Sequence, residues 1–279
     1  MFRSTNSRSA LEMDAEWFRR RLQRRHSEPV ALTAALFPAR LLKVLFAFPR
    51  CWTASRRMQY RWRSDNGSDA RTAASSLASS GLPDCDIVFI NLSHRHDRRQ
   101  SFESQMGALG IESFQRFEAV RARPGGLGCS MSHQGVLRGW FPRDGALLMV
   151  CEDDAIFLAS RSELDEIIRE FAANPRLSVL ALANNTPWRN RISNTLAVSS
   201  DIQTTACYVV KASAISGLIR STQVSIASFH AKRRYAASAI DQVWKRFQGE
   251  VYFAVPRRRV VMQMPSHSDI EEAWRNYET

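Results

Sequence analysis

The sequence is poor in glycine and proline, with 12 and 10 among its 279 residues. That scarcity excludes a collagen-like or low-complexity chain. The first residues also lack the continuous apolar core of a secretory signal peptide, so none is expected. Hydrophobic residues nevertheless make up 44% of the chain. Disorder throughout is therefore excluded, and the length suffices for one large α/β domain or two small ones.

Uninterrupted hydrophobic runs of membrane-spanning length are also missing. The most apolar stretch, residues 29–49, is about as long as a transmembrane helix. However, Pro38, Arg40 and Lys43 interrupt its middle, and a central arginine costs ~2.5–3.5 kcal/mol in a bilayer. The stretch therefore predicts an interfacial amphipathic segment rather than a span. A helix packed on the body, or an extension that arises from a misplaced start codon, remains an open alternative.

Cysteine is scarce and dispersed. The five cysteines form no CxxC motif and stand at positions 51, 85, 129, 151 and 207. An odd number at such wide spacing is not typical of a disulfide scaffold. We therefore expect no structural disulfide and a reducing, cytoplasmic compartment.

The positive charge is unevenly distributed. Residues 1–80 carry 15 basic and 6 acidic side chains, whereas the other 199 residues carry 24 and 21. Residues 64–81 have almost no apolar content and predict a linker. We therefore expect a basic extension over 1–80, disordered or at a membrane surface, and a body over 81–279. Nucleic-acid binders usually spread their charge over a folded face, so nucleic acid is not expected, whereas an anionic membrane suits such an arm.

The body opens with a βαβ pattern. Residues 87–92 are almost continuously apolar, which suits a strand buried on both faces. Phe102, Met106 and Leu109 then recur at helical spacing before Gly110, a candidate helix cap. Further strands are expected at 114–120, 146–151, 177–182, 207–210 and 251–255. Further helices are expected from about 130, over 160–171 after a capping box, over 212–220 and over 241–247, with an irregular tail.

An acidic triplet, Glu152-Asp153-Asp154, follows the apolar strand at 146–151. Side chains at i and i+2 of an extended backbone point to the same side. We therefore expect Glu152 and Asp154 to converge and Asp153 to point away. Two carboxylates facing one ligand suit Mg²⁺ or Mn²⁺ carrying a substrate diphosphate. The alternative is a solvated turn with incidental acids.

Two further segments can carry chemistry. Residues 121–129 are rich in glycine and proline and predict a loop whose free N–H groups hold a phosphate or approach a sugar closely. They match neither GxGxxG nor the Walker pattern, so a tight turn is the alternative, with His133 as a packed or capping residue.

Asp241 begins a short helix that contains Trp244 and Phe247. It is a candidate base, metal ligand or hydroxyl binder, or only a helix-start acid.

Seven short motifs occur in an order that resembles glycosyltransferase family 25, the lipopolysaccharide-type sugar transferases. They are IVFINLSHRHDRR at 87–99, FEAV at 117–120, LGCSMSH at 127–133, LLMVCEDDAIF at 147–157, TTACYVVKASAISGLI at 204–219, DQVW at 241–244, and Gln263 with SDI at 268–270. The resemblance covers about residues 86–270. Two features depart from it: no acid follows NL in the first motif, and residues 184–200 match no pattern.

The resemblance implies a GT-A-like α/β fold, a Rossmann-like mostly parallel sheet flanked by helices. It implies a nucleotide-sugar donor, with UDP-galactose as the first candidate, and a divalent Mn²⁺ or Mg²⁺ ion as cofactor. The acceptor implied is a saccharide hydroxyl, lipid-linked in bacterial surface glycans, and transfer is expected to invert configuration. By motif position, the expected metal ligands are Asp154 and Glu152. The expected base is Asp241, with Asp153 as the second candidate. The residues expected to contact the donor are Asn91, Gly128, His133 and Glu152.

Two other classes remain open at this point. A metal-dependent phosphoesterase would use the same acids, but it normally adds His/Asp clusters for a second metal ion, and the six histidines form none. A non-enzymatic protein that binds membranes or nucleic acid through its basic arm would not need the acidic triplet at all.

Overall fold

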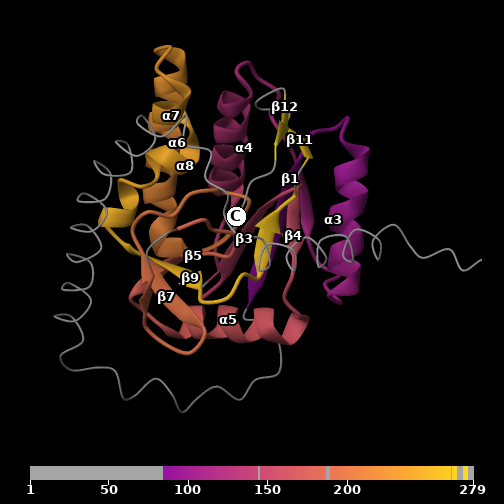
Figure 1. Cartoon of the computed structure of the whole chain (residues 1–279), viewed down its shortest axis with the longest axis vertical. Coiled ribbons are helices and arrows are strands. Elements are labelled where there is room, and N and C mark those ends of the chain that lie inside the picture. The colour runs from indigo at the N-terminus through magenta and orange to yellow at the C-terminus, as the bar shows by residue number, and fades with distance from the viewer. Residues whose placement is uncertain (1–83, 144, 187–188, 265, 269–272, 276–279) are drawn as a thin grey trace, which may run out of the picture. The chain divides into compact units, whose positions relative to one another are not determined.

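The computed structural model describes residues 84–279, apart from 144, 187–188, 265, 269–272 and 276–279 (Figure 1). The basic extension over 1–80 lies outside the described residues, and so do the apolar stretch at 29–49 and the linker at 64–81. The boundary at residue 81 therefore stays a prediction.

An eight-stranded mixed sheet forms the centre of the described part (Figure 1). Six of its strands run in one direction, while β8 and β7 run in the other. The predicted mostly parallel sheet flanked by helices is thereby confirmed, although the reversed strand between β3 and β5 was not expected. The order is β2 (Gln115–Glu118), β1 (Cys85–Asn91), β3 (Leu147–Glu152), β8 (Cys207–Lys211), β5 (Leu177–Ala181), β9 (Tyr252–Pro256), β7 (Leu196–Ser199) and β6 (Asn190–Arg191).

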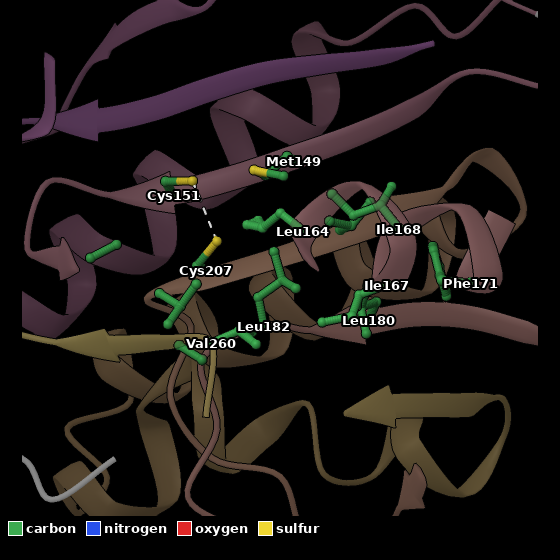
Figure 2. Packing of buried hydrophobic residues seen from close by; sticks show 14 of the residues in the cluster. Met149, Cys151, Leu164, Ile167, Ile168, Phe171, Leu180, Leu182, Cys207 and Val260 are labelled. Atoms are coloured by element: carbon green, nitrogen blue, oxygen red, sulfur yellow. Dashed lines mark hydrogen bonds between the residues drawn. The ribbon is translucent and has the colours of Figure 1, made fainter. Parts of the chain in front are cut away.

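Helices cover both faces of this sheet, which explains why its central strands are apolar without alternation. On one face, α5 (Arg161–Ala173) shares a hydrophobic cluster with Met149 and Cys151 of β3 (Figure 2). Buried side chains of α3 (His96–Ala108) belong to the same cluster. On the other face, α4 (Gly125–Gly139) and α6 (Ala212–His230) pack against Leu148 and Val150. Successive side chains of a single strand thus enter two different hydrophobic cores.

The predicted helix signals at 109–110 and 160–163 are confirmed. After α3, Gly110 adopts a positive φ of 65°, and the Ile111 N–H donates to the Met106 carbonyl, which closes a Schellman motif. Before α5, the hydroxyl of Ser160 accepts from the Glu163 N–H while the Glu163 carboxylate accepts from the Ser160 N–H. Both ends are therefore fixed by local sequence.

Two predicted helix bounds are wrong. The helix expected from about Ser130 begins at Gly125, so most of the expected glycine-rich loop is the first turns of α4. A Cβ at Gly128 would lie 2.3 Å from the Val120 carbonyl oxygen, so glycine permits close packing there. The helix expected to end at Arg220 continues to His230, because small and polar residues in its second half are buried against neighbouring helices.

The C-terminal part is also more ordered than the expected irregular tail. After short helices α7 (Tyr235–Ser238), α8 (Ile240–Val243) and η1 (Phe247–Gly249), β10 (Val261–Gln263) pairs antiparallel with β4 (Ala155–Phe157). A second pair joins β11 (Ser266–Ser268) and β12 (Ala273–Arg275). The β10–β4 pairing carries Gln263 to the residues that follow β3.

Two observations bear on the cysteines and on membranes. The four cysteines of the described residues are free thiols, and Cys151 and Cys207 are directly opposite on β3 and β8, with their sulfurs 3.5 Å apart (Figure 2). Within residues 84–279, as far as they are described, no helix has both the length and the apolarity to cross a bilayer.

Gly128→Ala is expected to destabilise the fold by ~1–3 kcal/mol, because backbone atoms of residues 120–122 must move to admit the new Cβ. Gly107→Ala in α3 is the matched control. Its Cβ would meet nothing within 4 Å, so helix propensity should leave stability unchanged or raise it by up to ~1 kcal/mol. Urea unfolding measures both changes. Equal stability of the two variants would contradict the packing role of Gly128.

Candidate functional site

The acidic triplet lies at the C-terminal end of β3, but its side chains are not arranged as the strand alternation predicted. β3 ends at Glu152, and Asp153 and Asp154 form the turn into β4. Because the alternation stops there, Asp153 does not point away. One guanidinium nitrogen, Arg98 Nη1, donates to Asp153 Oδ1 at 2.9 Å and to Asp154 Oδ2 at 3.2 Å. The two aspartates therefore share a partner.

Asn91 is fixed against the same group. Its amide nitrogen donates to Asp153 Oδ2 at 2.7 Å and to the Arg95 carbonyl, while its amide oxygen accepts from Arg116 Nε at 3.0 Å. Both carboxylate oxygens of Asp153 are thus engaged, one by Arg98 and one by Asn91. The structure places Asn91, a predicted donor contact, as a residue that orients Asp153.

Glu152 turns to a different set of partners. Its Oε1 accepts from the Thr205 hydroxyl at 2.6 Å and lies 3.2 Å from His133 Nε2. The other ring nitrogen of His133 lies 3.1 Å from the Tyr208 hydroxyl. His133 is completely buried on α4, and its ring is held between a carboxylate and a phenol. The predicted donor contacts His133 and Glu152 are therefore in direct contact with each other.

Gly128 does not lie in a phosphate-facing loop. It belongs to the first turns of α4 and packs on the backbone that follows β2. The structure therefore supplies a packing reason for glycine at this position. The contact with Val120 holds α4 against the segment that follows β2, while His133, further along α4, contacts Glu152 at the end of β3.

The electrostatics of the triplet differ from residue to residue. Burial, followed by the charge of Glu152, raises the pKa of Asp154 to about 7. Burial also raises the pKa of Asp153, although Arg98 and Asn91 oppose the shift. Burial would likewise raise the pKa of Glu152, but His133, Thr205 and Arg98 together hold it below its ordinary value. The two aspartates therefore share one guanidinium, while Glu152 is hydrogen-bonded by Thr205 and contacts His133.

One buried carboxylate oxygen of the acidic triplet has no hydrogen-bond partner. Asp154 Oδ1 is buried and has no hydrogen-bond partner, whereas Asp154 Oδ2 is bound by Arg98 and Gln263. A buried carboxylate oxygen without a partner is costly unless a cation or donor completes it. Hard oxygen atoms of this kind are the ligands that Mg²⁺ and Mn²⁺ prefer. The residues at the end of β3 therefore fit the predicted divalent ion.

Asp241 joins the same network from a distant part of the sequence. The Thr204 N–H donates to Asp241 Oδ2 at 3.4 Å, and the Thr204 hydroxyl donates to Gln263 Oε1 at 3.4 Å. Gln263 Nε2 in turn donates to Asp154 Oδ2 at 3.2 Å. Burial raises the pKa of Asp241. The structure thus connects Asp241 to Asp154 through Thr204, by its backbone N–H and its hydroxyl, and through the side chain of Gln263.

The backbone at Thr204 is strained. Its φ of 69° lies in the left-handed region, which is a genuine outlier for a β-branched residue. Such a conformation costs ~1–3 kcal/mol and persists only where its surroundings impose it. Here it allows the N–H and the hydroxyl of one residue to reach Asp241 and Gln263.

Sequence reasoning missed the residues that organise this site. Arg98, Thr204 and Thr205 stand in two of the motifs that resemble family 25, but no role was assigned to them, and Arg116 was interpreted only as part of a strand. Arg98 lies in the first turn of α3, directly after the strand that carries Asn91. An arginine at the start of the helix that follows β1 was the available signal, because that helix begins at the same edge of the sheet as the acids.

No family model matches the sequence, and no curated protein does. Among solved structures, the chain is similar to a glycosyltransferase involved in the glycosylation of the major capsid of PBCV-1, with 10% identity over 68% of this chain and 97% of that one, at a TM-score of 0.42. It is also similar to a mannose-1-phosphate geranyltransferase from Thermus thermophilus, with 10% identity over 65% and 74% of the two chains, at a TM-score of 0.33.

A third solved structure is a nucleoside-diphosphate-sugar pyrophosphorylase from Vibrio cholerae, with 10% identity, coverage of 61% and 70%, and a TM-score of 0.27. All three scores are below 0.5, so these likenesses carry no argument about function.

Arg98→Met is expected to destabilise the metal-free protein by ~3–5 kcal/mol, because it leaves two buried aspartates beside Glu152 without their cation. Arg99→Met is the neighbouring control: its ion pair with Glu103 is exposed and contributes at most ~1 kcal/mol. Urea unfolding in EDTA measures both.

Adding Asp154→Asn to the Arg98→Met variant should restore part of the lost stability, because the two residues interact and their effects are not additive. If Arg98→Met costs no more than Arg99→Met, Arg98 does not hold the aspartates together.

Proposed function

We propose that this protein is a metal-dependent glycosyltransferase that transfers a sugar from a UDP-sugar to a saccharide hydroxyl. Galactose is the first candidate for the sugar, and the transfer inverts the configuration of its anomeric carbon. The observation that carries the proposal is the buried, unpartnered Oδ1 of Asp154, beside two further carboxylates at the C-terminal end of β3. Ligands of α/β proteins bind at this edge of the sheet. The family 25 resemblance of residues 86–270 supplies the reaction class.

Asp154 and Glu152 are the residues that would hold Mn²⁺ or Mg²⁺, with Asp153 kept in place by Arg98 and Asn91. Such an ion, when bound, offsets the charge that develops on a departing nucleoside diphosphate. Arg98 completes the arrangement, because it bonds both aspartates and reduces their mutual repulsion.

The acceptor hydroxyl must lose its proton to a base in an inverting transfer. We assign this role to Asp241. Burial raises the pKa of Asp241 and so increases its affinity for a proton, while the Thr204 N–H holds one carboxylate oxygen. Asp153 is the second candidate, but Arg98 and Asn91 engage both of its oxygens. Asp241 is therefore favoured.

The acceptor and the location of the enzyme are inferred from the sequence. A basic extension suits attachment to an anionic membrane surface on the cytoplasmic side, where lipid-linked saccharides of bacterial surface glycans are built.

The full chain should then sediment with anionic vesicles but not with neutral ones. Equal sedimentation with both would contradict the attachment.

Asp154→Asn should abolish metal-dependent hydrolysis and transfer of a UDP-sugar, because it removes a charged ligand from the ion while keeping the shape of the side chain. EDTA should have the same effect on the unaltered protein. Asp97→Asn is the control, since Asp97 is exposed on α3 and pairs with Arg95. Full activity of Asp154→Asn, with a fold that is unchanged by circular dichroism, would refute the metal site.

Asp241→Asn should reduce transfer to acceptor by ~10²–10⁴-fold and leave donor affinity near normal, because only the proton acceptor is lost. Steady-state kinetics with separate donor and acceptor titrations measure the two effects. Glu250→Gln, an exposed acid on the following segment, is the control. A fall in donor affinity instead would make Asp241 a metal or ribose ligand, and the base assignment would be wrong.

A further inference from the structure

Three side chains beside the acidic turn bring a sulfur, a nitrogen and an oxygen together. Cys129 and His133 are four residues apart on α4 and therefore lie on one side of the helix. Glu152, the last residue of β3, faces them. One ligand atom from each of the three lies within 4.8 Å of the other two. This cluster adjoins the pair of aspartates that Arg98 holds but includes neither of them.

The donor atoms of this cluster differ in chemistry from those of the aspartates. A thiolate and an imidazole are ligands for Zn²⁺ and related transition metals, whereas Mg²⁺ takes oxygen ligands. We propose that Cys129, His133 and Glu152 bind a thiophilic divalent ion of the Zn²⁺ type, in a second metal site that shares Glu152 with the proposed catalytic one.

Neighbouring side chains already orient two of these three ligands. The Tyr208 hydroxyl lies 3.1 Å from His133 Nδ1, and the two rings stack with their centroids 5.8 Å apart. The Thr205 hydroxyl donates to Glu152 at 2.6 Å. Outer partners of this kind fix the orientation of metal ligands and raise metal affinity. Without an ion, Nε2–H donates to Glu152; for Nε2 to bind a metal ion, the ring proton would instead reside on Nδ1, where the Tyr208 hydroxyl can accept it.

Two of the three ligands keep some solvent exposure. His133 is completely buried, but Cys129 and Glu152 are only half-buried. On binding, the sulfur–metal bond forms as the Cys129 thiol releases its proton to solvent. Three protein ligands leave a fourth tetrahedral position open. The site therefore has the ligand number of an exchangeable zinc site rather than a closed structural one.

The shared ligand has a functional consequence, which rests on the proposed function. The Oε1 of Glu152 faces His133 and Thr205, so an ion bound by Cys129 and His133 would compete for this carboxylate with an ion bound by Asp154. Zn²⁺ bound by Cys129 and His133 would therefore withdraw Glu152 from the Mn²⁺ or Mg²⁺ ion. Zn²⁺ should then inhibit sugar transfer.

The test is a Co²⁺ titration of the full chain, because a cobalt–thiolate bond gives a charge-transfer band in the near ultraviolet. We expect the band in the unaltered protein and expect Zn²⁺ to remove it. Cys129→Ser should abolish the band. Tyr208→Phe should keep it and weaken Co²⁺ binding by ~10–100-fold. Cys85→Ser is the control, since Cys85 lies at the opposite end of β1 and should leave the band unchanged.

The proposal is overturned if the unaltered protein shows no band, or if a correctly folded Cys129→Ser or His133→Gln variant binds Co²⁺ with an unchanged spectrum. His133→Gln serves as the second variant if Cys129→Ser does not fold. The band requires no sugar substrate, so its presence or absence is independent of transferase activity. Failure of the proposed function therefore leaves this result intact, and the reverse also holds.

Discussion

The contact between Arg98 and the two aspartates after β3 is the interaction on which the site depends. Both aspartates are largely buried, and Arg98 is the guanidinium that bonds them. Charges in such surroundings are tolerated only when paired or bound to a metal ion. The pairing also fixes α3 against the end of β3, so one ion-pair group links the first βα unit of the sheet to the acids that the proposed chemistry requires.

The rest of the site is assembled by topology. β8 runs antiparallel between β3 and β5, and this reversal delivers Thr204 and Thr205 to the edge where β3 ends. β10 then crosses to β4 and brings Gln263 to Asp154. Segments distant in sequence thereby meet at one edge of the sheet, as ligand sites of α/β folds do. The strained backbone at Thr204 is consistent with a functional role for this edge.

Much of this fold could be predicted from the sequence, since long apolar strands, the capping box at Ser160 and the cap at Gly110 are local signals. The triplet could be located at the end of β3 for the same reason. The partners could not be predicted. Whether Asp153 points toward Asp154 depends on where β3 ends, and whether Gly128 lies in a loop or a helix depends on its contact with Val120. Both are properties of tertiary packing.

The central claim is that the acids after β3 bind a divalent ion together with a nucleotide. Electron paramagnetic resonance of Mn²⁺ with the full chain tests it most directly, since free and bound Mn²⁺ give different signals. The account predicts stoichiometric Mn²⁺ binding that UDP strengthens and that Asp154→Asn abolishes, while Asp97→Asn retains it. Mn²⁺ binding that is absent from the unaltered protein, or unchanged in a folded Asp154→Asn variant, would contradict it.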